Sequence, residues 1–156
     1  MKKTAILSIV FLLFLNGCGF KVINQNKLRN FDIAEITTQG DNRINYYIKN
    51  MLFFNSESSQ KKLIKINLNT NKKKNVKEKN IKNEITKYQI NISVNVTYYI
   101  LGKSNSTKFT ISENGDYRIG KMHSQTINNE KKLVKSLTNN ISEKIVNELI
   151  TRLNDI

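Results

Sequence analysis

The sequence has one cysteine, one histidine, no proline and no tryptophan. A single cysteine cannot form an internal disulfide, so the fold must be held together by its core. A lone histidine has no second histidine with which to share a zinc site. These shortages exclude a disulfide scaffold and argue against a metal centre.

Catalytic motifs are missing as well. The sequence contains no glycine-rich phosphate loop and no cluster of paired carboxylates. Ser124 follows His123, and Asp116 lies seven residues upstream, but closeness in sequence does not make a catalytic triad. We therefore expect a protein that is not an enzyme, with no catalytic residue, metal or cofactor, and we interpret His123 as a surface loop residue.

The amino terminus has the pattern of a secretory leader. Met1–Lys3 is a short basic segment, and Thr4–Leu15 is an apolar run too short to span a bilayer. The following stretch LNGC, residues 15–18, resembles the bacterial lipobox. In that pattern residues 1–17 are removed, and the cysteine receives an S-diacylglycerol and an N-acyl lipid. We predict that Cys18 is the lipid anchor; the alternative is a buried free cysteine after an uncleaved anchor.

The mature chain divides into a lipidated tether, residues 18–30, and one domain, residues 31–156. No later run approaches the length of a transmembrane helix. Acyl chains on Cys18 would hold the protein on a membrane, because each buried methylene contributes about 0.8 kcal/mol. Gly19 stands where inner-membrane lipoproteins commonly have Asp. By that resemblance we expect an anchor in the inner leaflet of the outer membrane, on the periplasmic side.

Positive charge dominates, with 26 Lys and Arg residues against 12 Asp and Glu and a formal net charge of +14. A basic chain ordinarily suggests nucleic acid, which a secreted lipoprotein does not meet. Anionic lipids or phosphorylated glycolipids are therefore the expected partners. A competing explanation is genome composition, because abundant Lys, Ile and Asn without Pro is typical of AT-rich coding sequences. The sequence leaves open how much of the charge is functional.

The first half of the domain alternates between strand and helix patterns. Residues 31–36 form a β-prone run, and Asp41 is expected to cap a helix that ends near Phe54. The apolar face of that helix comprises Ile44, Tyr47, Ile48, Met51 and Leu52. Residues 63–68 return to period two, which predicts a strand with its even-numbered side chains in the core.

The clearest strand covers residues 88–100, where apolar or aromatic side chains at even positions alternate with mostly polar ones. This alternation predicts a sheet with one covered face and one solvated face. After a turn, residues 107–111 should return as the partner strand of a hairpin. Asn114-Gly115 is a strong turn signal, and residues 116–120 are either a short strand or an ordered loop.

A long amphipathic helix is predicted over residues 129–154. Its apolar stripe comprises Leu133, Val134, Leu137, Ile141, Ile145, Val146, Leu149, Ile150 and Leu153. Its polar face comprises Lys132, Lys135, Asn139, Ser142 and Glu143. A stripe this wide suits packing on a sheet better than a two-stranded coiled coil. In the order β-α-β-β-β-α, the elements predict an α+β fold in two layers: a four-stranded mixed sheet with two helices on one face.

The stretch GCGF at residues 17–20, the short tether, this order of elements and the long final helix together resemble the LptE/RlpB family of lipopolysaccharide-assembly lipoproteins. The resemblance covers essentially the whole mature chain. Small α-proteobacterial members commonly begin Gly-Cys-Gly-Phe-Arg-Pro-Leu-Tyr, whereas this chain continues with residues 21–24 as KVIN. The resemblance implies a non-enzymatic role: a plug inside the LptD β-barrel that helps it assemble and helps insert lipopolysaccharide into the outer leaflet.

Basic side chains near loop tips could contact the phosphates of lipid A. The lipopolysaccharide-binding candidates are Lys72, Lys73, Lys74 and Lys77 in the loop before the long strand, and Arg118 and Lys121 after the hairpin. For each one the alternative is an ordinary solvated side chain. The hairpin would return the chain towards the start of the long strand, so both groups should lie at the same end of the sheet.

Two other functions fit the sequence. The first is a periplasm-facing lipoprotein that binds and activates or recruits a soluble cell-envelope enzyme. The second is a lipid-carrying adaptor, which should enclose a cavity rather than a filled core. The three hypotheses differ in what co-purifies with the protein: a barrel, an enzyme or a lipid.

We predict that Cys18→Ala abolishes lipidation, because it removes the sulfur that accepts the diacylglyceryl group. The variant should accumulate as an unprocessed precursor or a mislocalised soluble form. Mass spectrometry of the wild-type amino terminus provides the check. An unmodified Cys18, or retention of Lys2 and Lys3, would contradict the assignment.

Overall fold

The structure is a computed structural model that describes residues 31–54 and 62–154. The predicted leader, Cys18 and the tether lie outside the described residues. The elements are β1 (Phe31–Gly40), α2 (Asn42–Phe54), β2 (Lys62–Lys79), β3 (Ile85–Ile100), β4 (Ser106–Arg118) and α3 (His123–Asn154). Their order confirms the predicted β-α-β-β-β-α sequence.

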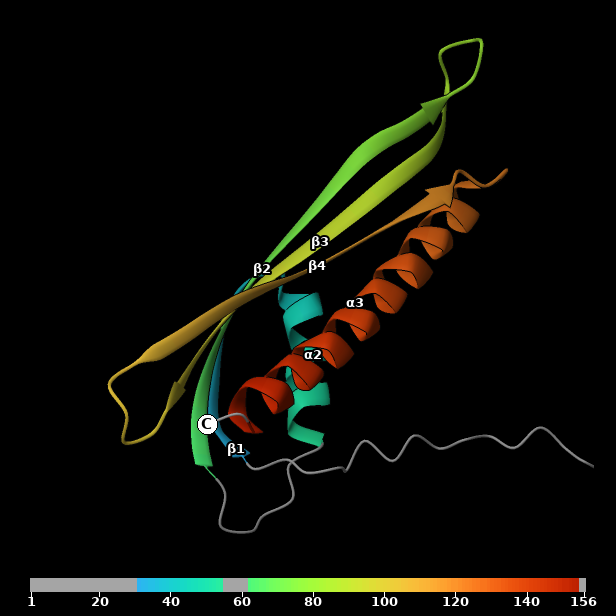
Figure 1. Cartoon of the computed structure of the whole chain (residues 1–156). Helices are drawn as coiled ribbons and strands as arrows, with labels where there is room; N and C mark the ends of the chain where they lie inside the picture. The colour runs from blue at the N-terminus through green and yellow to red at the C-terminus, as the bar shows by residue number, and fades with distance from the viewer. Residues whose placement is uncertain (1–30, 55–61, 155–156) are drawn as a thin grey trace, which may run out of the picture.

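The four strands form one sheet in the order β1-β2-β3-β4. β1 runs parallel to β2, to which it is joined through α2, and the other neighbours are antiparallel. Both helices lie on the same face of the sheet, and α3 crosses it diagonally (Figure 1). The mixed sheet with two helices on one face confirms the predicted α+β class.

The core lies between that face and the two helices. The even-numbered side chains of β2 from Ile64 to Leu68 and of β3 from Ile90 to Tyr98 are buried, as the alternation predicts. The helices contribute Ile44, Ile48, Leu52, Leu137, Ile141, Ile145, Val146, Leu149 and Leu153. Tyr47, which we expected on the buried face of α2, is instead 45% exposed.

β2 is much longer than its apolar pattern predicts. Residues 71–79, interpreted above as a loop, continue the strand and pair with β3, in regular register as far as Val76, for example Lys72 with Ile92 and Lys74 with Ile90. Every residue of this stretch is exposed, so no alternation of hydrophobicity marks it as a strand. The end of the β2–β3 hairpin projects beyond β4 and α3 (Figure 1).

The predicted turn at Asn114-Gly115 is wrong, because both residues lie inside β4. Gly115 pairs with Ile90 and therefore lies on the helix-covered face. A Cβ atom at position 115 would lie 2.7 Å from Leu133 Cδ1, so a larger residue there would require the Leu133 side chain to move. Residues 116–118 continue the strand, and only the following two residues of the ambiguous stretch leave it.

α3 begins at His123 rather than Asn129, so His123 is the exposed first residue of a helix and not a loop residue. The Gln125 side chain accepts a hydrogen bond from the Met122 N–H at 3.3 Å, as a residue in the first turn does when it closes a helix start. Ser142, expected on the polar face, is 1% exposed. Its hydroxyl donates to the Thr138 carbonyl at 2.8 Å, which satisfies it inside the core.

Neither α2 nor α3, the helices of the described ranges, has the combined length and apolar character needed to cross a bilayer.

We predict that Val94→Asp destabilises the protein by about 3 kcal/mol or more, because Val94 is 0% exposed and the new carboxylate would have no partner. Ser93→Asp, one residue away on the solvated face, should change the free energy of unfolding by only about 0.5 kcal/mol. Denaturant unfolding of both variants measures the difference. Equal losses would contradict the assignment of the two faces.

Candidate functional site

The face of the sheet opposite the helices, here called the open face, has an array of amides and hydroxyls at its centre, and Lys73 and Lys108 lie on the same face. Its central positions are Asn67, Asn69, Asn71, Asn91, Ser93, Asn95, Thr97, Thr110, Ser112 and Asn114. The register aligns them into rows across three strands, so that Asn69 lies beside Asn95 and Asn95 beside Thr110. Alternation in three long strands places these small polar side chains together.

Cross-strand hydrogen bonds order part of the open face. The Thr110 hydroxyl donates to Asn95 Oδ1 at 2.8 Å, and the Ser112 hydroxyl donates to Ser93 Oγ at 3.0 Å. A shallow pocket of about 350 Å³ lies on this face beside Asn67 and Asn95. The open face is therefore suited to hydrogen bonding with a polar partner rather than to burial against another apolar layer.

The six predicted lipopolysaccharide candidates do not form one cluster. Lys72 and Lys74 extend on the helix-covered side of β2, where each meets a carboxylate. Lys72 Nζ lies 3.2 Å from Asp41 Oδ2, and Lys74 Nζ lies 2.6 Å from Glu130 Oε2. These two lysines are consequently neutralised by the fold, which corrects their interpretation as free loop lysines.

The other four candidates remain exposed. Lys73 lies on the solvated side of β2, and Lys77 occupies the irregularity in β2 between Val76 and Glu78. Arg118 pairs with Lys87 of β3, and the next residue of β3, Tyr88, pairs with Val76 of β2. Arg118 and Lys77 therefore lie at the same end of the sheet. Lys121 follows β4 in the connection to α3.

A buried junction ends β1 and starts α2. Gly40 has φ +92°, and a Cβ atom there would lie 1.9 Å from the Thr70 carbonyl oxygen, so only glycine fits where the chain leaves the sheet. Asn45 donates to the Gln39 carbonyl at 2.9 Å and accepts from the Thr70 hydroxyl at 2.6 Å. Asn45 thus joins the first turn of α2 to both strands, and nothing in the sequence pattern announces this role.

Asp41 caps α2, as predicted. Its Oδ1 accepts hydrogen bonds from the N–H groups of Arg43 and Ile44, each at 3.1 Å. Burial alone would raise the pKa of Asp41, but the hydrogen bonds from Ile44 and Lys72 outweigh burial and lower it below 3.8. Asp41 is therefore a charged residue that is already fully engaged.

A second polar cluster joins the β2–β3 hairpin to the start of α3. Glu130 Oε2 accepts from both Lys74 Nζ and the Tyr117 hydroxyl, each at 2.6 Å. Lys74 also lies 4.3 Å from the centre of the Tyr88 ring. Burial would raise the pKa of Glu130, but the hydrogen bonds from Lys74 and Tyr117 outweigh it and lower the pKa below 4.5. Burial and Glu130 raise the pKa of Tyr117 above 10.0.

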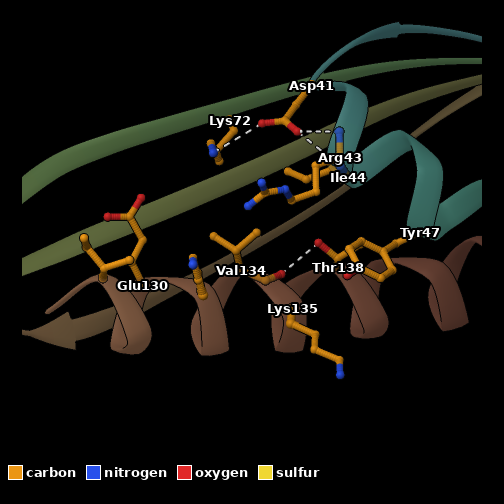
Figure 2. Close-up of a pocket in the computed structure, with 11 residues that line it drawn as sticks. Asp41, Arg43, Ile44, Tyr47, Lys72, Glu130, Val134, Lys135 and Thr138 are labelled. Atoms are coloured by element: carbon orange, nitrogen blue, oxygen red, sulfur yellow. Dashed lines mark hydrogen bonds and ion pairs between the residues drawn. The ribbon is translucent and has the colours of Figure 1, made fainter. Parts of the chain in front are cut away.

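A groove of about 630 Å³ lies between the start of α2, β2 and α3. Ile44, Tyr47 and Val134 supply its apolar surface, and Asp41 and Lys72 lie along one side (Figure 2). The sequence pattern assigns these apolar residues to the helices' packing faces. Their shared groove follows only from how the helices meet.

No group of three or more His, Cys, Asp or Glu side chains within residues 31–54 and 62–154 is arranged to hold a metal ion.

We predict that Glu130→Gln lowers stability at pH 7, because Lys74 and Tyr117 lose a charged acceptor. The pKa of Glu130 in the folded protein is below 4.5, so its contribution is complete above that pH and is lost as the pH falls through the folded value. The difference between wild type and variant in urea midpoint should therefore shrink below about pH 4.5. Glu143→Gln, on the exposed face of α3, is the matched control, and a pH-independent difference would contradict the assignment.

No protein-family model and no curated protein sequence matches the chain. Solved structures do match. The rare lipoprotein B structure from Shewanella oneidensis has a TM-score of 0.59 at 12% identity, covering 76% of this chain and 95% of that one. A putative lipoprotein from Caulobacter crescentus has a TM-score of 0.55 at 14% identity, covering 76% of this chain and 90% of that one.

An uncharacterized lipoprotein B from Nitrosomonas europaea has a TM-score of 0.54 at 11% identity and covers 85% of this chain and 91% of its own. The similarity therefore extends over most of both chains in all three comparisons. At these identities it is a similarity of fold. The chain has the fold of the rare lipoprotein B structures.

Proposed function

We propose that this chain is an LptE-type outer-membrane lipoprotein, anchored through Cys18, that plugs and helps assemble the LptD β-barrel. In the same role it helps insert lipopolysaccharide into the outer leaflet. The fold it shares with rare lipoprotein B supports this proposal, and so does the lipobox-like stretch at residues 15–18.

The observation that carries the plug role is the open face. The interior of a large outer-membrane barrel is polar and lined with hydrogen-bonding groups. The Asn, Ser and Thr side chains at the centre of the open face offer hydrogen-bond donors and acceptors to such a wall, and neutral groups cost less to desolvate than charged ones. Cross-strand hydrogen bonds already join Ser93 with Ser112 and Asn95 with Thr110 on that face.

The projecting β2–β3 hairpin supports the lipopolysaccharide role. Its turn is built by Asn80, whose Oδ1 accepts from the N–H groups of Lys82 and Glu84, each at 2.9 Å. The turn presents Ile81 fully exposed next to Lys82, while Lys73 and Lys77 lie exposed along the strand. An apolar side chain beside ammonium groups matches an amphiphile that carries both acyl chains and phosphates.

The two alternative functions have less support. A lipid-carrying adaptor needs an enclosed cavity, whereas aliphatic side chains fill the space between the sheet and the helices in the described residues. A lipoprotein that recruits a cell-envelope enzyme would also need a docking surface. It would differ from a barrel plug in the protein that it binds.

The test is purification of the natively expressed lipoprotein in mild detergent, followed by identification of the bound protein and quantification of bound lipopolysaccharide. We expect a β-barrel partner of the LptD type. Lys73→Gln combined with Lys77→Gln should retain the barrel but bind lipopolysaccharide about two- to thirtyfold more weakly, because each exposed ionic contact contributes about 0.2–1 kcal/mol. Lower salt should enlarge the difference.

Lys103→Gln combined with Lys132→Gln is the matched control, since it removes the same charge from exposed positions outside both the hairpin and the open face. If both double variants lose lipopolysaccharide equally, the charge acts as a diffuse field and the hairpin is not a binding site. Capture of a soluble enzyme instead of a barrel would overturn the plug role.

A further inference from the structure

One edge of β2 is left without a neighbouring strand. β1 pairs with β2 only as far as Gly40 and Thr70, and then turns away into α2. β2 continues to Lys79, and among the described residues no strand pairs with it on that side beyond Thr70. A stretch of strand edge from Asn71 to Lys79 is therefore available for pairing.

The backbone direction along this edge follows from the hairpin. The Leu101 N–H donates to the Leu63 carbonyl at 2.8 Å, so Leu63 directs its main-chain groups towards β3. In an antiparallel pair this direction alternates with each residue, and the register is regular from Ile64 to Val76. The N–H and C=O groups of Lys72 and Lys74 consequently point to the side that β1 has vacated.

The groove between α2 and α3 adjoins this edge. Lys72 belongs to both, and Asp41, the residue that follows the end of β1, lies beside it (Figure 2). A strand added at Lys72 and Lys74 would continue the line of β1. Its side chains of one parity would project on the helix-covered side, towards the apolar surface of Ile44 and Val134.

The charges around the groove indicate what kind of segment would bind there. Asp41 is engaged by the α2 cap and Lys72, and Glu130 is engaged by Lys74 and Tyr117. Arg43 and Lys131 also line the groove, and neither forms an ion pair with a carboxylate of the described residues. In Figure 2 the Arg43 side chain lies between Lys72 and Val134, whereas Lys135 extends away from the groove. The site therefore has unneutralised positive charge around an apolar surface.

We propose that the bare edge of β2, together with the groove, binds an extended acidic segment of a partner polypeptide by strand addition. Main-chain hydrogen bonds to Lys72 and Lys74 would supply the pairing, and the groove would accept an apolar side chain flanked by carboxylates. A second copy of this chain is disfavoured as occupant, because its own edge carries five lysines and one glutamate between positions 71 and 79. The inference does not rest on the lipopolysaccharide role.

The experiment uses the full mature lipoprotein in non-ionic detergent and a fluorescent peptide with the sequence Glu-Val-Glu-Leu-Glu-Val-Glu-Val. Fluorescence anisotropy should show saturable binding that weakens with salt. Hydrogen exchange should slow at the amides of Lys72 and Lys74 when the peptide is added. The Lys73 amide, which points to β3, should change little.

Two matched controls separate the parts of the site. A peptide N-methylated on alternate residues keeps its charge but loses edge hydrogen bonds, and should bind at least about fivefold more weakly. Arg43→Gln combined with Lys131→Gln should weaken binding about two- to thirtyfold, against no change for Lys103→Gln with Lys108→Gln. Absence of binding, equal binding of the N-methylated peptide, or equal binding of a peptide with Lys in place of Glu would overturn the proposal.

Discussion

The burial of one face of β2 and β3 beneath the helices is the constraint on which the rest of the structure depends. Side chains alternate along a strand, so a buried row of Ile, Val and Leu requires every intervening residue to face the other way. The chain has only two helices among its described elements, and both are used on the same face. The opposite face is consequently left to Asn, Ser and Thr, and becomes a broad polar surface rather than a second core.

The strands of the central hairpin are longer than the helical layer that covers them. Where the cover ends, the sheet is held by its backbone ladder and by the contacts of Lys74 with Glu130 and Tyr88. Beyond that point both faces of β2 meet solvent, and lysines are the residues that a solvated strand edge tolerates best. The hairpin therefore projects because β2 and β3 are longer than the helical layer that covers them.

The excess positive charge divides into groups with different physical situations. Lys72 and Lys74 meet carboxylates on the covered side, and their removal would leave Asp41 and Glu130 without counter-charges. Lys73 and Lys77 are exposed, while Arg43 and Lys131 border an apolar groove. Lys73 and Lys77 belong to the same stretch of β2 as the bare edge, so the two proposed sites share that part of the strand.

The sequence by itself determined the strands and helices in which apolar side chains recur at a regular spacing. The even-numbered residues of β3, the stripe of α3 and the cap at Asp41 announce their roles, because burial on one face imposes a repeat that can be counted. The α+β class and the order of elements follow from the same repeats. Residues 71–79 show no hydrophobic repeat, since nearly all of their side chains are polar on both faces of the strand, and their strand character was decided by pairing with β3.

Tertiary structure also decided the use of individual residues. Asn114-Gly115 has the sequence of a turn, but Gly115 lies within a strand and leaves room for the Leu133 side chain. Ser142 is polar, but it is buried and its hydroxyl donates a hydrogen bond within its own helix. The pairing of Lys74 with Glu130 joins positions 56 residues apart, which no local pattern encodes. The bare edge of β2 arises because β1 stops at Gly40 while β2 continues, a difference in strand length that becomes visible only when the two are paired.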